Sequence, residues 1–451
     1  MSFLITAVKS LQELHMSLIK SQVLEAVAYL RTSHFLGNVT KLASGEVCAQ
    51  TVGFCSIPIL TRLYSPEAFG LMGLFIAITE VGGRISTLRY DVALVLPKED
   101  RDAWSLLRFS AGGCLLFSVV LLAVAYPFRR DISLAFGSDL LAQYFPLVAL
   151  MILVMGWQSL TMFWSLRQKH FKSIAKSAAG SSVLGHGLKI LGGVIGFGAG
   201  GLLIGSVAQR LFNFLILRFL ATPREIWKLE SKKGEGLRQA AVHREFPMYR
   251  MPQDTLNSLT RQLPNILLVS FFSPVAAGFY ILATRVLELP FSIFQDVVRK
   301  VFYVQAVDAD RAGESLFRLC SLMSILIAVV MAPLVLIVFM WGSFLFELVF
   351  GTGWATTGSY AKWVMLASLF SFCSVPASVV IPVVGMNKFY LIFEAISMVF
   401  RVSVLVFAAM SWTVDVTVAA IAICSSVSSS FLIGIVLSRL WRMNLLRAQS
   451  V

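Results

Sequence analysis

Charged residues are scarce in this sequence of 451 residues, because only 14% are Asp, Glu, Lys or Arg. Ordinary soluble domains contain about 25%. Hydrophobic residues make up 57% even before the 31 glycines are counted. A chain with so few polar residues cannot form a mostly polar surface in contact with water, so it is not a soluble globular domain. The same composition excludes a disordered chain, collagen and a coiled coil.

Paired cysteines and cofactor fingerprints are also lacking. Six cysteines lie singly within apolar stretches, at Cys48, Cys55, Cys114, Cys320, Cys373 and Cys424. Their spacing indicates neither a disulfide framework nor a zinc site. The glycine-rich run 180–205 has no Walker or dinucleotide spacing, so its glycines are expected to permit close helix packing or kinking. We therefore expect no metal site, no cofactor and no enzyme active site.

Long apolar runs dominate what the sequence does contain. They predict an all-α integral membrane protein with about twelve transmembrane helices. The predicted spans are 38–60, 69–90, 106–128, 140–165, 173–197, 200–221, 253–272, 275–298, 316–341, 357–384, 389–410 and 415–438. The first, fifth and seventh are the weakest, because their polar content is high.

The remaining segments complete the predicted domain order. Residues 1–37 mix charged and apolar positions without the uninterrupted apolar core of a signal peptide, so we expect an amphipathic helix at the cytoplasmic membrane surface. Bundles of six helices are expected at 38–221 and 253–440. A basic cytoplasmic linker at 222–252 separates them, and a cytoplasmic tail follows at 441–451.

Basic residues are distributed unevenly between the predicted loops. If the N-terminus is cytoplasmic, 28 Lys and Arg residues lie on the cytoplasmic side and three, Arg62, Arg129 and Arg130, on the other. Cytoplasmic loops carry an excess of Lys and Arg, so both termini are predicted to be cytoplasmic. The net charge of +14 therefore mostly reflects the excess of bases in cytoplasmic loops, and it does not indicate nucleic-acid binding.

The two predicted bundles share a sequence pattern at an offset of 208 residues. Ser65-Pro66-x-x-x-Gly70 recurs as Ser273-Pro274-x-x-x-Gly278, and five acidic positions coincide where chance gives about one. Because six helices return the chain to its starting side, the two repeats have the same orientation in the membrane. Transporters built in this way place the substrate between their halves. Two similar bundles that merely pack together remain the alternative.

Charges inside the predicted spans are the candidate functional groups. A charge at the bilayer centre costs about 2.5–3.5 kcal/mol on insertion scales, so these side chains are expected to face a cavity or one another. Glu80 and Arg84 are four residues apart and Arg285 and Glu288 three apart, which places each pair on one helix face. Such pairs could also serve only to orient two helices, and Arg210 could instead reach the membrane surface.

Seven basic and five acidic residues within the spans give a slightly cationic interior, which favours an anionic substrate. In the span 253–272 a polar stripe runs down one side, and 38–60 carries a weaker one with Gln50. These two spans are therefore predicted to face each other across an aqueous cleft. His186 lies between two glycines and is more typical of a packing residue than of a proton carrier. The candidate substrate-binding residues are Arg84, Lys189, Arg210, Asn257, Arg261, Arg285 and Arg401.

Four segments resemble bacterial polysaccharide-biosynthesis flippases of the Wzx kind, within the superfamily that includes multidrug exporters and the lipid II flippase. They are PILTRLYSPEAFGLMGLFIAI at 58–78, RYDVALVLPKEDRDA at 89–103, the stretch 246–290 that begins FPMYRMPQDTLNS, and FGTGWATTGSYAKW at 350–363. The similarity covers the chain from about residue 35 onward. It departs at Gly353, where the family commonly has an acid.

The resemblance implies a V-shaped transporter in the bacterial inner membrane that moves an undecaprenyl-diphosphate-linked oligosaccharide for O-antigen, capsule or exopolysaccharide assembly. Alternating access coupled to H⁺ or Na⁺ is expected by analogy, with Glu46, Glu80, Asp254 and Glu288 as coupling groups. A polysaccharide polymerase and a chain-length regulator are possible partners. A drug exporter of the same superfamily is the main alternative, and a membrane-embedded polymerase or ligase is a second.

Overall fold

A computed structural model describes residues 34–138, 140–221 and 234–449. Within these ranges the chain consists of helices joined by short turns, with no β-strand. The predicted surface helix at 1–37 falls almost wholly outside them, as does the first part of the predicted linker, 222–233.

The first bundle contains the long helices of the N-terminal half. These are α2 (His34–Leu63), α3 (Pro66–Ser86), α5 (Asp100–Ala125), α8 (Phe145–Arg167), α9 (Phe171–Val194) and α10 (Ala199–Ala221). Short helices connect them: α4 (Tyr90–Ala93), α6 (Arg129–Ala135) and α7 (Leu140–Gln143). Helix α9 packs against α2 and α10, while α8 contacts α3, α5 and α10. We call this bundle the N-lobe.

The predicted linker is partly helical, with α11 (Glu235–Val242) followed by the π-helix η2 (Phe246–Arg250). The second half contains α12 (Met251–Phe271), α13 (Pro274–Arg311), α14 (Leu316–Phe350), the short η3 (Thr352–Trp354), α15 (Ala355–Cys373), α16 (Val375–Val383), α17 (Asn387–Ser411) and α18 (Val414–Gln449). Helices α13 to α18 form the C-lobe. Helix α12 contacts α3 of the N-lobe as well as α13 and α17, so it connects the two.

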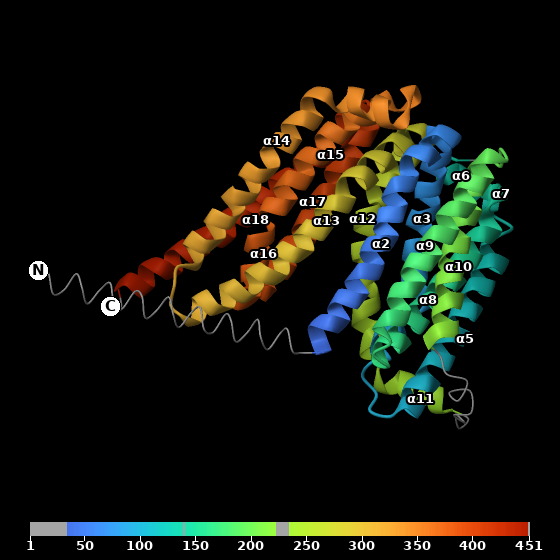
Figure 1. The fold of residues 1–451 in the computed structure, drawn as a ribbon, viewed down its shortest axis with the longest axis horizontal. Helices are drawn as coiled ribbons and strands as arrows, with labels where there is room; N and C mark the ends of the chain where they lie inside the picture. The colour runs from blue at the N-terminus through green and yellow to red at the C-terminus, as the bar shows by residue number, and fades with distance from the viewer. Residues whose placement is uncertain (1–33, 139, 222–233, 450–451) are drawn as a thin grey trace, which may run out of the picture.

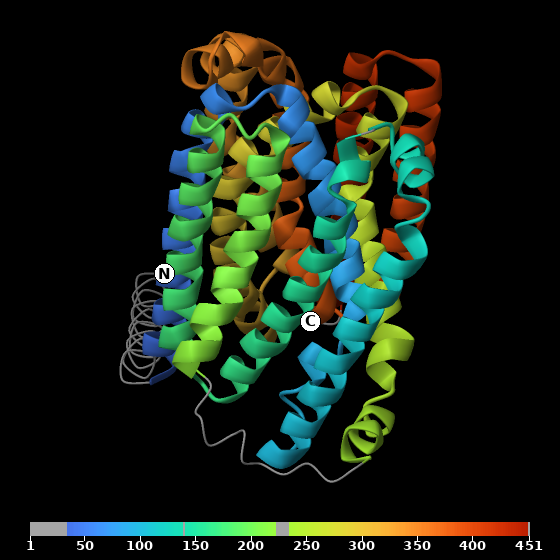
Figure 2. The same cartoon turned by 90° about the vertical axis from the view of Figure 1, so that its right-hand side faces the viewer.

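The two lobes form a V (Figure 1). Helices α2 and α13 lie close together at one end and diverge toward the end that carries α11. We call these the closed end and the α11 end. The side view in Figure 2 shows the N-lobe helices running between them. The three bases predicted to lie opposite the basic loops, Arg62, Arg129 and Arg130, are at the ends of α2 and α6, at the closed end.

Helices occupy all twelve predicted spans, with α15 and α16 sharing one of them. Among the described residues, eight segments are long and apolar enough to cross a membrane: those of α3, α5, α8, α10, α14, η3–α16, α17 and α18. Helices α2, α9, α12 and α13 are not among the eight. The first, fifth and seventh predicted spans are three of these four, because polar residues interrupt them. The multi-pass membrane fold is thus confirmed, while the count of twelve crossings stays a prediction.

Several helices extend beyond the predicted spans. Helix α13 continues from residue 298 to Arg311, and α18 continues through most of the predicted tail to Gln449. At about 1.5 Å per residue, the 38 residues of α13 are longer than the 30 Å apolar core of a bilayer. Hydropathy detects only the apolar part of such a helix, so the polar end was missed. The predicted span 357–384 is divided at Ser374, two residues before Pro376, which cannot donate a backbone hydrogen bond.

The repeated Ser-Pro-x-x-x-Gly motifs meet at the closed end. Ser65 and Ser273 each accept a hydrogen bond from a backbone N–H three residues later, at 3.3 and 3.2 Å, and so cap α3 and begin α13. Gly70 lies directly against the carbonyl of Pro274, and Gly278 lies against that of Pro66. A Cβ atom at either glycine would overlap the opposite backbone. The contact is therefore reciprocal, as expected from a repeat related by a twofold axis.

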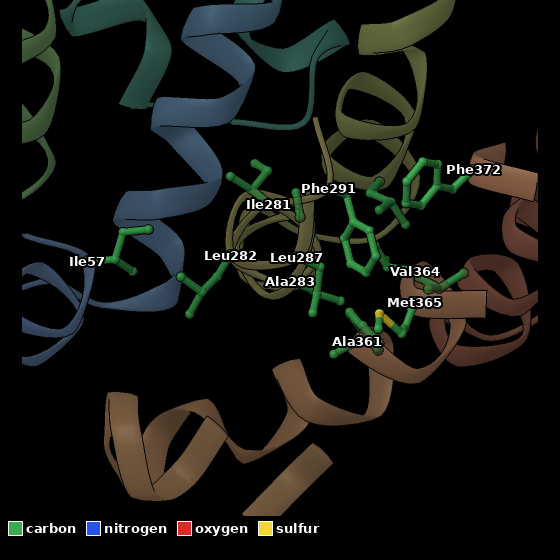
Figure 3. Close-up of a cluster of buried hydrophobic side chains, with 14 of the residues drawn as sticks. Ile57, Ile281, Leu282, Ala283, Leu287, Phe291, Ala361, Val364, Met365 and Phe372 are labelled. Carbon is green, nitrogen blue, oxygen red and sulfur yellow. The ribbon is translucent and has the colours of Figure 1, made fainter. Parts of the chain in front are cut away.

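Apolar side chains hold the lobes together around α13. Figure 3 shows Leu282 directed toward Ile57 of α2, while Leu287 and Phe291 lie toward α15. Trp354 strengthens the closed end, because its indole N–H donates a 2.9 Å hydrogen bond to the carbonyl of Thr61 across the lobes. Packing and hydrogen bonding are thus concentrated at one end of the V, and cavities lie farther along it.

Candidate functional site

A polar cavity of about 330 Å³ lies within the N-lobe. Five N-lobe helices line it, α2, α3, α8, α9 and α10, and one residue of the C-lobe, Arg285 of α13, reaches its wall. Its charged residues are Glu46, Glu80, Lys189, Arg210 and Arg285, all predicted from the sequence. Three bases against two acids give this cavity a net positive charge.

Arginines share the carboxylate of Glu80. Arg84 lies 3.6 Å from one oxygen and Arg210 lies 3.8 Å from the other. Arg210 also donates a 3.3 Å hydrogen bond to Gln158 of α8. The predicted Glu80–Arg84 pair is therefore present, and Arg210 faces the cavity and not the membrane surface.

Lys189 is the most enclosed base of the cavity, with 5% of its surface exposed. Its ammonium donates a 2.9 Å hydrogen bond to Gln209, and its backbone carbonyl accepts a 2.6 Å bond from Tyr64. One turn earlier on α9, the imidazole of His186 lies 2.6 Å from the hydroxyl of Ser56. The glycine-rich sequence of α9 allows close approach to α10, because Gly185 packs against Gln209 with no room for a Cβ.

A second cavity, of about 380 Å³, lies between the lobes. Helices α2, α3 and α9 form one wall and α13 the other. It shares His186, Lys189 and Arg285 with the N-lobe cavity and contains Gln50 and Glu288. Arg285 and Lys189 therefore lie where the interior of the N-lobe meets the space between the lobes.

A third cavity, of about 460 Å³, lies within the C-lobe. Arg261 of α12 and Arg401 of α17 line it, together with Glu288 and the hydroxyl groups of Thr284 and Ser368. Because Glu288 also lines the cavity between the lobes, and Arg285 lines both that cavity and the N-lobe cavity, the three cavities are neighbours. Two of the predicted bases thus line the C-lobe cavity and three the N-lobe cavity, while Arg84 contacts Glu80.

Asp254 lies apart from these cavities. One of its oxygens is 2.8 Å from Nε of Arg89 and 3.1 Å from Nε of Arg250. The Arg89 contact is an ion pair without an aligned hydrogen bond. Arg89 also lies 3.3 Å from Asp91, which accepts a hydrogen bond from Ser159. Asp254 therefore joins α12 to the N-lobe near the α11 end.

Two predicted arrangements differ from the structure. None of the three cavities is lined by both α2 and α12; α2 packs on α9, whereas α12 packs on α3. The partner of α2 across the space between the lobes is α13. Among the described residues Arg285 and Glu288 form no ion pair, although both line the cavity between the lobes; Arg285 also reaches the N-lobe cavity and Glu288 that of the C-lobe. Asn257 is exposed and lines none of the three.

Uncharged polar residues of the N-lobe cavity were missed in the sequence. Gln158 of α8 donates a 3.1 Å hydrogen bond to Asn213 of α10, which donates one of 3.1 Å to Ser181. Amides in the middle of apolar spans are a detectable signal, since each needs a partner away from lipid. Among the residues that the structure describes, no three His, Cys, Asp or Glu side chains are placed to hold a metal ion.

Solved transporter structures share this fold. The lipid II flippase MurJ, in an inward closed conformation, aligns over 90% of each chain with 13% identity and a TM-score of 0.68. An inward-facing multidrug resistance transporter of the MATE family aligns over 87% of this chain and 95% of its own, with 13% identity and a TM-score of 0.61. At such low identity the likeness establishes the two-lobed fold and nothing about the cargo.

Sequence comparison is more informative about the family. The succinoglycan biosynthesis transport protein ExoT of Rhizobium meliloti (strain 1021) is 22% identical over 308 residues. These cover 65% of this chain and 59% of ExoT, so the match spans less than two thirds of that relative. The family model described as polysaccharide biosynthesis protein matches residues 59–358. This region contains both Ser-Pro-x-x-x-Gly motifs and most of the charged residues that line the cavities. The chain therefore belongs to the polysaccharide biosynthesis protein family.

Proposed function

We propose that this protein is a flippase that moves an undecaprenyl-diphosphate-linked oligosaccharide across the bacterial cytoplasmic membrane. The observation that carries the proposal is the series of neighbouring cavities lined by bases, with Lys189, Arg210 and Arg285 on the N-lobe side and Arg261 and Arg401 on the C-lobe side. The family supports a role in O-antigen, capsule or exopolysaccharide assembly.

The chemistry of the cavities fits a diphosphate. An unpaired anion moved from water into an apolar medium costs tens of kcal/mol by Born solvation, so a lipid-linked diphosphate needs cations along its path. Guanidinium groups bind phosphate oxygens through two parallel hydrogen bonds. Arg285 is the best placed, because it lies between the lobes and reaches the N-lobe cavity. Polar side chains of the cavities would bind the sugars.

Alternating access follows from the shape of the V. We place the α11 end in the cytoplasm, together with both termini, because the predicted basic loops lie there. The substrate headgroup would enter between α2 and α13, while its lipid tail stays in the bilayer. Closure at the α11 end and separation of the Gly70 and Gly278 contact would then expose it to the opposite side.

Coupling to H⁺ or Na⁺ would use acidic residues of the cavities. Glu46 lines the N-lobe cavity and Glu288 the two cavities beside Arg285. Among the described residues neither forms an ion pair, whereas Glu80 and Asp254 are each shared by two arginines. We therefore propose Glu46 and Glu288 as the primary coupling groups. A polymerase and a chain-length regulator would act on the exported product.

A drug exporter of the same superfamily is the second candidate, supported by the fold shared with the MATE transporter. Organic cations favour an acidic or aromatic cavity, and the excess of bases here favours anions instead. A polymerase or ligase is a more distant alternative, because the described ends of the N-lobe helices opposite α11 are joined by short segments.

The test replaces Arg285 and Arg261 with Ala, separately, in a strain that contains the cognate glycan genes but lacks its own copy of this gene. At normal membrane abundance each variant should lower surface glycan at least tenfold, with lipid-linked repeat units accumulating on the cytoplasmic leaflet. Arg318→Ala is the control, because Arg318 is exposed at the start of α14 and lines none of the three cavities. Unchanged export in both variants would refute the basic path, and altered drug resistance with normal export would favour the drug exporter.

A further inference from the structure

The outer face of the N-lobe contains a cavity that is not part of the proposed flippase path. Its volume is about 350 Å³, and α5, α8 and α10 line it. Figure 2 views this face and shows α8 between α5 and α10. The wall includes Trp104, Trp157, Trp164 and Phe214 together with Arg108 and Arg218. It faces away from the opening between the lobes.

The cavity lies toward the α11 ends of α5 and α8, where two membrane-spanning helices are expected to reach the membrane surface. Trp104 stands one turn after the start of α5, and Trp164 one turn before the end of α8, both toward the α11 end. Tryptophan is enriched at this depth, since its ring is apolar and its N–H is polar. A ligand here would therefore have a polar headgroup near the surface and an apolar part in the bilayer.

One polar group in the wall has no partner. The indole N–H of Trp164 forms no hydrogen bond with any described residue, although only 1% of the side chain is exposed. By contrast, the indole N–H of Trp157 donates a 3.2 Å bond to the carbonyl of Ala111. Trp164 is held in place by edge-on packing against Trp104, with ring centroids 5.4 Å apart. A buried donor without a partner is unfavourable, so an acceptor on a ligand would satisfy it.

The basic residues in the wall favour an anionic ligand. Among the described residues that line it, Arg108 and Arg218 are the ionisable ones, and none of these residues carries a carboxylate. Arg108 is exposed and forms no ion pair with the part of the chain that the structure describes. Two guanidiniums and an indole N–H are all donors, and they suit a phosphate group. The aromatic rings suit the glycerol backbone and the first carbons of an acyl chain.

We propose that this cavity binds the headgroup of an anionic glycerophospholipid of the cytoplasmic leaflet. The substrate lipid also carries phosphate, but the basic cavities of the proposed path lie on the other side of the N-lobe wall, around Arg210 and Lys189. A bilayer phospholipid reaches the outer face directly. The proposal does not depend on what the protein transports.

The experiment measures lipid binding to the purified full-length protein by native mass spectrometry in a mild detergent. Phosphatidylglycerol should bind at least tenfold more tightly than phosphatidylcholine. The double variant Arg108→Gln, Arg218→Gln should remove this preference, and Trp164→Phe should weaken phosphatidylglycerol binding severalfold, because it removes the N–H together with part of the buried ring. Arg101→Gln is the matched control, since Arg101 lies on α5 outside the cavity and should leave binding unchanged.

Equal binding of the two lipids, or a preference that survives in the double variant, would overturn the proposal. Undecaprenyl phosphate is tested as a competitor. If it displaces phosphatidylglycerol at a concentration below that of the phosphatidylglycerol, the cavity binds the isoprenoid lipid instead, and the proposal is wrong. Should the variants fail to fold, a photoactivatable phosphatidylglycerol on the unmodified protein gives the answer. Labelling must fall on peptides of α5, α8 or α10 that contain Trp104, Trp164 or Arg218, and labelling confined to other helices would refute the site.

Discussion

The acidic side chains of the protein interior have unequal surroundings. Glu80 and Asp254 each lie within 4 Å of two arginines, whereas Glu46 and Glu288 have no ion-pair partner among the described residues. A carboxylate whose charge is already balanced by two arginines attracts a further cation less than an unpaired carboxylate does. Residues that the sequence presents as equivalent are thus separated by their neighbours into structural pairs and free carboxylates.

The contacts of Asp254 lead to a prediction about stability. Arg89 and Arg250 approach the same oxygen, but 15% of the Arg89 side chain is exposed against 51% for Arg250. Arg89→Gln should therefore cost about 2–3 kcal/mol, near the range for breaking a buried pair. Arg250→Gln should cost about 0–1 kcal/mol, as for a surface pair. Thermal unfolding in detergent tests this, and equal melting temperatures for the two variants would contradict it.

At the scale of elements, the closed end depends on the first turns of α3 and α13, which pack against each other. Gly70 of α3 meets the backbone at Pro274, and Gly278 of α13 meets the backbone at Pro66. Small residues allow helix backbones to approach closely within a membrane. The motif is repeated because each lobe supplies one half of the same contact.

Substitution of these glycines should open the closed end. Gly70→Val and Gly278→Val each place a side chain where the opposite backbone lies, so both should separate the lobes there by similar amounts. The measurement is labelling of Met72→Cys, a residue of the cavity between the lobes, by a membrane-impermeant thiol reagent added outside the cell. Labelling should rise at least fivefold in a background without other cysteines.

Gly112→Val on α5 is the matched control, because a Cβ at Gly112 meets no atom within 4 Å. It should leave the labelling of Met72→Cys unchanged. If the three variants behave alike, the reciprocal contact does not hold the closed end together.

At the scale of the whole molecule, the V opens on one side only. A cysteine at Gln50 in the cavity between the lobes should therefore react with impermeant thiol reagents in inside-out vesicles at least tenfold faster than in right-side-out cells. Asn257→Cys, exposed near the α11 end, should share this preference. The native Cys114 is fully buried and serves as the unreactive control. Equal labelling of Gln50→Cys from both sides would show that the closed end is not sealed.

Much of the fold could be predicted because lipid imposes simple rules on a sequence. Apolar runs, the loop bases and the 208-residue repeat are local or additive signals, so helix positions and their pairing into halves follow directly. The candidate charges were found for the same reason, since a charge among apolar residues is conspicuous. The polar ends of α13 and α18 were missed, because hydropathy falls where a helix leaves the membrane.

The contacts between residues of different helices could not be predicted, because they depend on how helices from different parts of the chain pack. The spacing of Arg285 and Glu288 is compatible with an ion pair, yet none forms among the described residues, and beyond the cavity that they share Arg285 reaches the N-lobe cavity and Glu288 that of the C-lobe. The polar stripes of the spans 38–60 and 253–272 suggested that they face each other, while packing placed α2 against α9 and α12 against α3. The tryptophan cavity is formed by three helices that are distant in the sequence.

The sequence by itself determined that the protein is embedded in a membrane and that its two halves are alike. It also determined which charged residues lie within the membrane spans. These follow from the free energy of placing each residue in lipid, a property of composition and order. Only the tertiary structure decided which charges are neutralised and which line the cavities, and which end of the V is closed. Those depend on distances between side chains that the chain brings together only by folding.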